Sequence, residues 1–362
     1  MSYNDYRRKT RPIRVGSLTI GGHAKISVQS MTNTDTHDVE ATYRQTVALR
    51  DAGCDVVRIT APDLDSVSSF AALRRMNVGV PVVADIHFDH RIAVAVAPYV
   101  DKIRINPGNI GSRDKVAEVV RACREYSLPI RIGVNSGSLE KSILEKHGAP
   151  TAAALVESAL YHASLLEELD FHDVAISVKA SNVPNMLAAN RLLAEKTDYP
   201  IHLGVTEAGA RTRAIVKSSI GIGALLSEGI GDTLRVSLTD DPVREAEAAR
   251  EILSALELDD RPRMDVVACP TCGRTRIALI DLVAEFERRI AADGLSDFGI
   301  KVALMGCVVN GPGEAREADI GIAGGKGEGL LFKKGEIIRK IPEDRLVDEL
   351  VAEIKQMRDA NR

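Results

Sequence analysis

The stretch DKIRINPGNIGSRDKVAEVVRACREYSLPIRIGVN, residues 101–135, decides how this chain folds. It begins with a short β-branched segment, continues through a helical stretch, and ends with a second β-branched segment. A strand-helix-strand unit of this kind takes about 30 residues and joins two parallel strands by a crossover helix. The stretch therefore predicts one βαβ unit.

The same unit repeats on both sides of this stretch. Eight β-branched segments are predicted as strands, with helices between them: 26–31, 55–60, 81–87, 101–106, 129–135, 173–179, 201–206 and 232–238. Eight strands in about 240 residues fit a (β/α)8 barrel better than a doubly wound open sheet, the alternative for alternating strands and helices. We predict the α/β class with a TIM-type barrel, and an additional helix in SLEKSILEKHGAP (138–150).

The pattern changes from about residue 242. The segment DPVREAEAAREILSALEL (241–258) predicts the closing helix of the barrel, and DDRPRM (259–264) predicts a linker. The remainder predicts a small α+β module with a helix, two strands, a hairpin and a final amphipathic helix. We expect a barrel domain at residues 1–258 and a second domain at residues 263–362.

Composition excludes several classes of protein. The 362 residues are 45% hydrophobic and 27% charged, which is typical of a folded globular chain. With 47 basic and 51 acidic residues the net charge is −4, so no global field favours nucleic acid or an anionic membrane. The basic N-terminus lacks the apolar region of a signal peptide, and we expect a cytoplasmic protein.

The predicted strands carry polar residues at alternate positions. Strands of a parallel barrel normally consist of nearly continuous apolar residues, since helices cover them outside and side chains fill them inside. Here one face of each strand is polar, and we expect it to point inward near the carboxyl ends of the strands, where active sites of this fold lie. This face carries Arg58, Asp85, His87, Lys102, Arg104, Asn106, Arg131, Asn135, Ser177, Lys179, Arg235 and Ser237.

Cations outnumber anions in this inward set. Asp85 and Glu207 face five cations: Arg58, Arg104, Arg131, Lys179 and Arg235. Guanidinium groups suit phosphate oxygens, so the excess predicts a substrate with two or three phosphate charges. A structural layer of salt bridges is the alternative. Glu207 has the parity of an outward residue, so its direction stays open.

The cysteines predict a metal site in the second domain. Of five cysteines, Cys269 and Cys272 form a C-x2-C motif in ACPTCGR, and Cys307 lies in MGCVVNGPGE. All eight histidines precede this region, so a zinc site would lack its usual fourth ligand. Three thiolates suit an iron-sulfur cluster, with Glu314 as the nearest further group. Zinc with a carboxylate, a redox dithiol or structural cysteines remain alternatives, and we expect Cys54 and Cys123 to be inert.

The motifs CPTCGRT and GCVVNGPGE, with VQSMTNTDT, ADIHF, IRINPGN, RIGVNSGSL, SVKASN, GVTEAG and RVSLTDDP in order, resemble one family. They are similar to the bacterial GcpE family, the 4-hydroxy-3-methylbut-2-enyl diphosphate synthases of the methylerythritol phosphate route to isoprenoids. The likeness covers nearly the whole chain, in the compact two-domain form. A pterin-synthase-like barrel transferase with a zinc-stabilised accessory domain is the alternative.

The resemblance implies a two-electron iron-sulfur oxidoreductase. It implies a [4Fe-4S] cluster on Cys269, Cys272, Cys307 and Glu314, reduced by flavodoxin or ferredoxin. It also implies reductive ring opening and dehydration of 2-C-methyl-D-erythritol 2,4-cyclodiphosphate, and a homodimer in which the cluster domain of one subunit caps the barrel of the other. The residues that match binding positions are Arg58, Arg104, Asn106, Asn135, Lys179, Arg235 and Ser237, and those that match acid/base positions are Asp85, His87 and Glu207.

Overall fold

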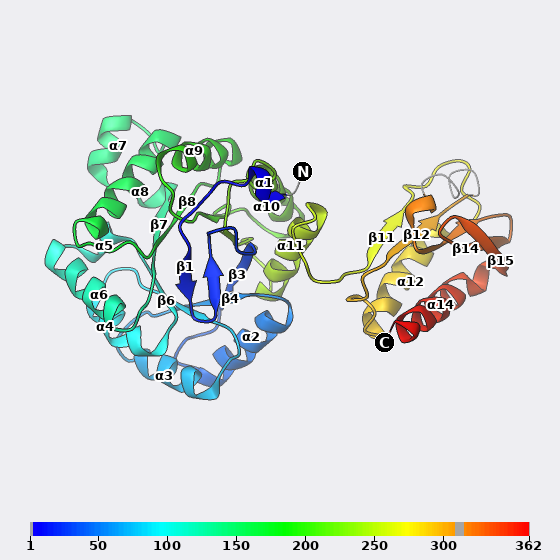
Figure 1. The fold of residues 1–362 in the computed structure, drawn as a ribbon, viewed down its shortest axis with the longest axis horizontal. Helices are drawn as coiled ribbons and strands as arrows, with labels where there is room; N and C mark the ends of the chain where they lie inside the picture. The colour runs from blue at the N-terminus through cyan, green and yellow to red at the C-terminus, as the bar shows by residue number, and fades with distance from the viewer. Residues whose placement is uncertain (1–2, 308–314, 362) are drawn as a thin grey trace. The chain divides into compact units, whose positions relative to one another are not determined.

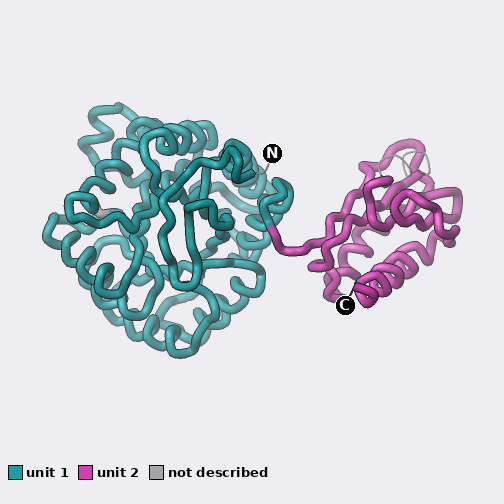
Figure 2. The backbone as a smooth tube through the Cα atoms, in the orientation of Figure 1, with its two compact units in different colours: residues 1–259 teal, residues 260–362 magenta. Residues whose placement is uncertain are grey.

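The computed structural model describes residues 3–307 and 315–361. The chain forms two compact units, Met1–Asp259 and Asp260–Arg362 (Figure 2). In the described part of the chain, no helix combines the length and the apolar character that crossing a membrane requires. Each unit has a hydrophobic core of its own.

The first unit is a barrel of eight parallel strands. They are β3 (Ser27–Met31), β4 (Val56–Thr60), β5 (Val82–Asp85), β6 (Lys102–Ile105), β7 (Ile130–Asn135), β8 (Val174–Lys179), β9 (His202–Leu203) and β10 (Thr233–Leu234). The sheet runs in the order β8-β7-β6-β5-β4-β3-β10-β9. A parallel bridge between Ile176 and Ile201 joins β8 to the residue before β9 and closes the cycle. The predicted (β/α)8 barrel is confirmed, and the open sheet is excluded.

Helices surround the strands (Figure 1). They are α2 (Val39–Asp51), α3 (Val67–Met76), α4 (His90–Val96), α6 (Arg113–Glu125), α8 (Ala152–Glu167), α9 (Val183–Lys196), α10 (Arg211–Ser227) and α11 (Pro242–Ala255). The apolar face of each strand packs against them, as fully buried Ile103 and Ile105 of β6 show. Helix α7 (Lys141–His147) is the predicted additional helix. Asp241 caps α11 by accepting the N–H of Val243, which explains why Asp-Pro starts that helix.

An N-terminal hairpin closes one end of the barrel. Strands β1 (Ile13–Val15) and β2 (Leu18–Ile20) pair antiparallel, and their apolar side chains cluster with Ala175 near the start of β8. Gly16 in the turn has φ +56°, and its backbone lies against Pro81 and Asp101, which precede β5 and β6. The hairpin therefore covers the amino ends of the strands, opposite the end where the sequence places the site. Sequence patterns did not predict this hairpin.

The second unit is a five-stranded sheet with helices on one face. Its strands are β11 (Asp265–Ala268), β12 (Lys301–Met305), β13 (Ile320–Gly324), β14 (Glu328–Lys333) and β15 (Glu336–Pro342), in that order. The first three are parallel and the last two continue antiparallel. Helices α12 (Leu279–Ala292) and α14 (Leu346–Ala360) share one core with the sheet. The predicted α+β module is confirmed, with β11 as an additional strand.

Candidate active site

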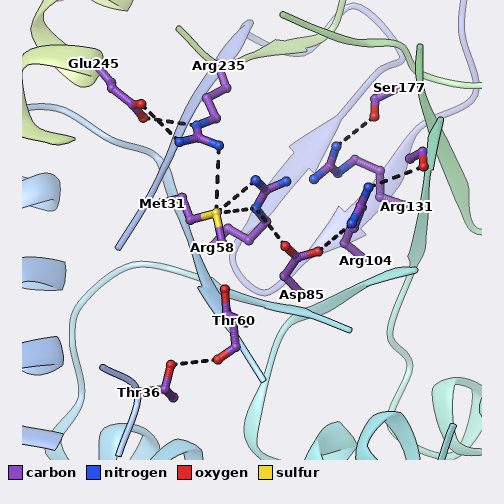
Figure 3. Close-up of polar contacts among 11 residues, drawn as sticks. Met31, Thr36, Arg58, Thr60, Asp85, Arg104, Arg131, Ser177, Arg235 and Glu245 are labelled. Atoms are coloured by element: carbon purple, nitrogen blue, oxygen red, sulfur yellow. Dashed lines mark hydrogen bonds and ion pairs between the residues drawn. The ribbon is translucent and has the colours of Figure 1, made fainter. Parts of the chain in front are cut away.

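Asp85 links two arginines inside the barrel. It ends β5, and its Oδ1 accepts a hydrogen bond from Nη1 of Arg104 at 3.0 Å, while its Oδ2 lies 3.8 Å from Nε of Arg58 (Figure 3). Desolvation alone raises the pKa of this buried carboxyl, but the charges of Arg58 and Arg104 outweigh that effect and hold the pKa well below its usual range. Asp85 is therefore an anion that fixes the two guanidinium groups.

A second carboxylate holds Arg235, which follows β10. Glu245 from α11 accepts Nε and Nη2 of Arg235, each at 3.0 Å, in a bidentate pair. The sulfur of Met31 lies between two guanidinium groups, since Arg58 donates to it at 2.9 Å and Arg235 approaches it at 3.8 Å. Three arginines are thus fixed by neighbours, as the salt-bridge alternative expects. The second anion is Glu245 rather than Glu207.

Two further cations lack such a partner. Arg131 of β7 donates Nη1 to Ser177 Oγ at 2.9 Å, but its Nε and Nη2 have no hydrogen-bond partner. Within residues 3–307 and 315–361, neither Arg131 nor Lys179 at the end of β8 pairs with a carboxylate. Burial, then repulsion from neighbouring cations, lowers the pKa of each well below its usual value. The salt-bridge layer is therefore incomplete, and these two basic side chains are left without a carboxylate partner among the described residues.

Deeper in the barrel lie two polar residues that the predicted cationic set did not contain. Lys102 begins β6 and His202 begins β9, and both are fully buried. His202 contacts Thr233, with Nδ1 3.4 Å from Oγ1. The alternation that predicted Arg104 also placed Lys102 on the inward face, two residues earlier. In the predicted strand 201–206, His202 alternates with apolar Ile201 and Leu203, so the same signal could have found it.

The remaining predicted residues lie at the carboxyl ends of the strands. Asn106 is buried and caps the short helix α5 (Pro107–Ile110) by accepting the N–H of Gly108 at 3.1 Å. Asn135 ends β7 and is half-buried, as is Ser237 beyond β10. His87 follows β5 and is exposed, with its ring centroid 6.1 Å from that of Phe88. Their backbone positions place all four residues at the end of the barrel opposite the hairpin.

Glu207 is exposed in the loop after β9, with φ +51°. This left-handed conformation is uncommon for a residue with a side chain and marks a sharp change in chain direction. The chain therefore turns at Glu207, so the alternation of β9 does not determine where its side chain points. Its acid/base role stays a prediction.

The cysteine motifs lie at one edge of the second sheet. Strands β11 and β12 are parallel neighbours, with Ala268 opposite Leu304. Cys269 follows β11 directly, and Cys307 follows β12 by two residues, so both loops leave the same edge of the sheet. Cys269 is half-buried, Cys272 exposed and Cys307 buried.

Backbone contacts join the two cysteine loops. Gly306 donates its N–H to Sγ of Cys269 at 3.2 Å, and Arg276 donates its N–H to the carbonyl of Gly306 at 3.0 Å. A Cβ on Gly306 would lie 2.9 Å from Cγ2 of Thr275, so this close approach requires glycine. Hydrogen bonds from Arg274 lower the pKa of the Cys272 thiol. An exposed thiol with a lowered pKa at Cys272 and an N–H···S bond to Cys269 suit sulfur ligands of iron.

The described residues do not complete a metal site. In residues 3–307 and 315–361, no group of three or more histidine, cysteine or acidic side chains is arranged so that it could hold a metal ion. Glu314, the predicted fourth ligand, lies outside the described residues. Cys54 and Cys123 are buried in the barrel, where burial raises the pKa of each thiol to about 12. The donor set of the second unit therefore fits thiolate ligation, and the two barrel thiols do not contribute to it.

Comparison with known proteins matches both units. The model of the GcpE TIM-barrel domain matches residues 10–250, and that of the GcpE protein C-terminal domain matches residues 265–356. The chain belongs to the GcpE family. It is 56% identical over 346 residues to the 4-hydroxy-3-methylbut-2-en-1-yl diphosphate synthase (flavodoxin) of Clostridium perfringens, covering 95% of this chain and 98% of that protein. The enzyme of the same name from Geobacter sulfurreducens is 55% identical over 352 residues, covering 97% of this chain and 98% of that protein.

These matches confirm the GcpE family and the activity predicted from the motifs, which is the one in the relatives' names. Nothing supports the pterin-synthase-like alternative. Among solved structures, the type I 3-dehydroquinate dehydratase of Clostridium difficile superposes with a TM-score of 0.51 at 14% identity, over 68% of this chain and 98% of that one. This likeness shows the barrel fold alone.

Proposed function

We propose that this GcpE-family chain converts 2-C-methyl-D-erythritol 2,4-cyclodiphosphate to 4-hydroxy-3-methylbut-2-enyl diphosphate. The observation that carries the proposal is the pair of buried basic side chains, Arg131 and Lys179, that no carboxylate of the described residues holds. A diphosphate supplies the missing anion and accepts the hydrogen bonds that Arg131 leaves unmade. The reaction consumes two electrons and two protons, opens one ring carbon–oxygen bond and releases water.

The barrel residues bind the substrate and hold it in place. Asp85 fixes Arg58 and Arg104, and Glu245 fixes Arg235, so the guanidinium groups are oriented before substrate arrives. Such preorganisation avoids ordering these side chains during binding. The other residues proposed to bind the substrate are Asn106, Arg131, Asn135, Lys179 and Ser237.

Proton transfer is assigned to residues at the mouth of the barrel. We assign the acid/base role to Glu207, with His87 as a second candidate for proton transfer to the substrate. Asp85 was predicted among these groups, but its pKa lies well below the usual range, next to Arg58 and Arg104. An ionised carboxylate with arginine partners suits the orientation of those arginines better than the donation of a proton.

The second unit is proposed to hold a [4Fe-4S] cluster on Cys269, Cys272 and Cys307, with Glu314 as the fourth ligand. When bound, the cluster supplies the two electrons, one at a time, from reduced flavodoxin or ferredoxin. A carboxylate is a harder and weaker iron ligand than a thiolate, so this position can be exchanged. The name of the relatives favours flavodoxin as the donor.

An anaerobic turnover assay tests the proposal. The reconstituted full chain, with reduced flavodoxin and the cyclic diphosphate, should form 4-hydroxy-3-methylbut-2-enyl diphosphate. Anaerobically purified protein should be brown and contain iron. Colourless protein that contains zinc and does not turn over would contradict the proposal.

The homodimer with a capping cluster domain stays a prediction. It is tested by mixing two inactive variants, Glu207→Gln and Cys307→Ser. In a mixed dimer with shared sites, one site has both lesions and the other has neither, so part of the activity returns. No recovery despite demonstrated subunit exchange would contradict shared sites.

A further inference from the structure

Several buried side-chain nitrogen atoms inside the barrel have no hydrogen-bond partner among the residues that the structure describes. They include Nζ of Lys102, Nε2 of His202, and Nε with Nη2 of Arg131, together with Nε2 of Gln29 and Nε of Arg104. Lys102 and His202 are 0% exposed and Arg131 is 1% exposed. Unpaired polar atoms with so little exposure are rare in proteins, because each loses its water without gaining a hydrogen bond.

Lys102 is enclosed from both ends of the barrel. The hairpin of β1 and β2 covers the amino ends of the strands, where Lys102 begins β6. Arg104 lies two residues further along the same face of β6, directly opposite Arg131 in the register with β7. The amine therefore lies between an apolar plug and the arginines of the proposed anion site, and it does not reach the mouth of the barrel.

The charges facing Lys102 are mostly positive. Arg131 of β7 and Arg58 of β4 act on Lys102 directly, and the barrel interior also contains Asp85, Arg104, Lys179, Arg235 and Glu245. His202 of β9 is a further titrating neighbour of Lys102, and burial lowers its pKa well below the usual value. Both carboxylates in this set already hold arginines. A charged amine here would be a buried cation without an anion, whereas the neutral amine avoids this cost. Consistent with this, burial and then repulsion from Arg131 and Arg58 lower the pKa of Lys102 well below its usual value.

We propose that Lys102 adjusts the charge of the anion site: its amine is neutral in the empty barrel and takes up a proton from solvent when a diphosphate binds above it. The ligand brings about three negative charges next to Arg131, which reverses the sign of the local potential and favours the ammonium form. No other bond forms or breaks. The inference rests on the proposed diphosphate site and adds a residue that responds to the ligand through its protonation.

The first consequence is a proton count that calorimetry can measure. Inorganic pyrophosphate is titrated into the full chain at pH 8 in buffers that differ in ionisation enthalpy, which gives the net protons taken up per ligand. Pyrophosphate itself loses protons on binding cations, so the informative quantity is the difference between wild type and Lys102→Met. We expect the variant to take up about one proton fewer.

His202→Gln is the matched control, because it removes the other buried titrating group of this layer while keeping hydrogen-bonding atoms. We expect it to keep the wild-type proton count. If His202→Gln removes the proton and Lys102→Met does not, the acceptor is His202 and the proposal for Lys102 is wrong.

A second readout is the pH dependence of affinity. Proton uptake makes binding tighten as pH falls, so between pH 7.5 and 9.5 the affinity of wild type should fall by up to about tenfold per pH unit relative to Lys102→Met. Equal proton counts and equal pH profiles in the two proteins would overturn the inference while leaving the diphosphate site intact. No binding of pyrophosphate to wild type would instead overturn the proposed diphosphate site, and the inference with it.

Folding of the variant is checked by thermal unfolding. Replacing an unpaired buried amine with an apolar side chain of similar length should raise the melting temperature of the full chain by a few degrees. If Lys102→Met is less stable than wild type in the absence of ligand, the amine has a stabilising partner, and the proposal is wrong.

Discussion

The barrel interior and the cysteine edge of the second unit differ in how far each is assembled in the chain alone. In the barrel, Arg58, Arg104 and Arg235 are held by Asp85 and Glu245 within 3.8 Å. At the cysteine edge, backbone contacts join the loops that carry the thiols, but no group of three or more histidine, cysteine or acidic side chains of the described residues is arranged so that it could hold a metal ion. The first site is preorganised, and the second depends on the group it binds.

The difference follows from where the residues are placed. Side chains on barrel strands inherit a fixed direction from the sheet, and neighbouring strands provide their partners. The thiols lie in loops after β11 and β12, where the backbone has fewer constraints. For loop ligands, binding the metal group contributes to folding the site. We therefore expect removal of a thiol to abolish its site, and removal of a barrel side chain to weaken binding or catalysis by degrees.

The largest effect is expected at the thiols. Cys269→Ser, Cys272→Ser and Cys307→Ser should each lose iron and all activity, because each removes one of three proposed thiolate ligands. Iron analysis after anaerobic reconstitution measures the result. Cys54→Ser and Cys123→Ser are matched controls that should keep both, since these thiols are buried in the barrel. A Cys307→Ser protein with normal iron content would show that the proposed ligand set is wrong.

The second-largest effect is expected on the turnover rate, at Glu207. Glu207→Gln should bind substrate and keep a normal cluster spectrum, yet lose roughly 10²- to 10⁴-fold in kcat, the usual contribution of a general acid or base. Glu207 is exposed, so this substitution should leave the fold intact. If kcat of Glu207→Gln equals that of wild type, Glu207 is not the general acid or base.

A smaller effect is expected on binding. Arg131→Ala should weaken substrate affinity roughly 10- to 150-fold, because a charge-assisted hydrogen bond contributes about 1.5–3 kcal/mol. Arg131 is a cleaner probe than Arg104 or Arg235, since it leaves no carboxylate without its partner. Equilibrium binding of the cyclic diphosphate to Arg131→Ala and wild type measures the change in affinity. The iron content of the variant should equal that of wild type. Unchanged affinity would favour a purely structural role for the arginines.

The barrel was predictable from sequence because two signals agree. The βαβ spacing specified eight units, and alternation within strands such as β6 separated outward Ile103 and Ile105 from inward Arg104. Helix α11 was predicted from Asp241-Pro242 for a similar local reason. The hairpin of β1 and β2 was missed, because its three-residue strands carry too little pattern to distinguish them from a loop.

The site was predictable only where strands carry it. Glu245 was missed because it lies on a helix, and nothing in a helical pattern shows which strand residue it will meet. The direction of Glu207 was open because φ +51° breaks the alternation at that residue. Partners between distant segments, such as Asp85 with Arg104, need the closed barrel to bring them together. The sequence indicated which side chains face inward, but not which of them pair.

The protonation state of Lys102 gives a further test of the comparison, because its amine has no hydrogen-bond partner among the described residues of the barrel. The pKa of Lys102 is lower in the folded protein than in the unfolded chain, where it has the usual value of about 10.5. At pH values between these two pKa values, the unfolded chain therefore binds more protons than the folded protein. Stability should therefore rise with pH across this window, by at most about 1.4 kcal/mol per pH unit relative to Lys102→Met. Urea unfolding of both proteins from pH 7.5 to 9.5, without ligand, measures the difference. A constant difference would mean that the amine keeps one protonation state throughout.

The smallest effect is expected at Thr275, which links the two cysteine loops. Its Oγ1 accepts the N–H of Cys272 at 3.0 Å, its own N–H donates to the carbonyl of Cys272 at 2.9 Å, and its side chain packs against Gly306. Thr275→Val keeps the shape but removes the acceptor, which for a capping hydroxyl costs about 1 kcal/mol.

If the loop contacts preorganise the thiols, Thr275→Val should release iron to a chelator roughly fivefold faster than wild type, the ratio that about 1 kcal/mol implies. Thr275→Ser keeps the oxygen and should stay close to wild type. Iron release from the reconstituted full chain measures both variants without relying on activity. Equal rates of iron release from Thr275→Val and wild type would mean that the bound group alone organises these loops. The cysteine edge would then have no preorganisation of its own, in contrast to the barrel.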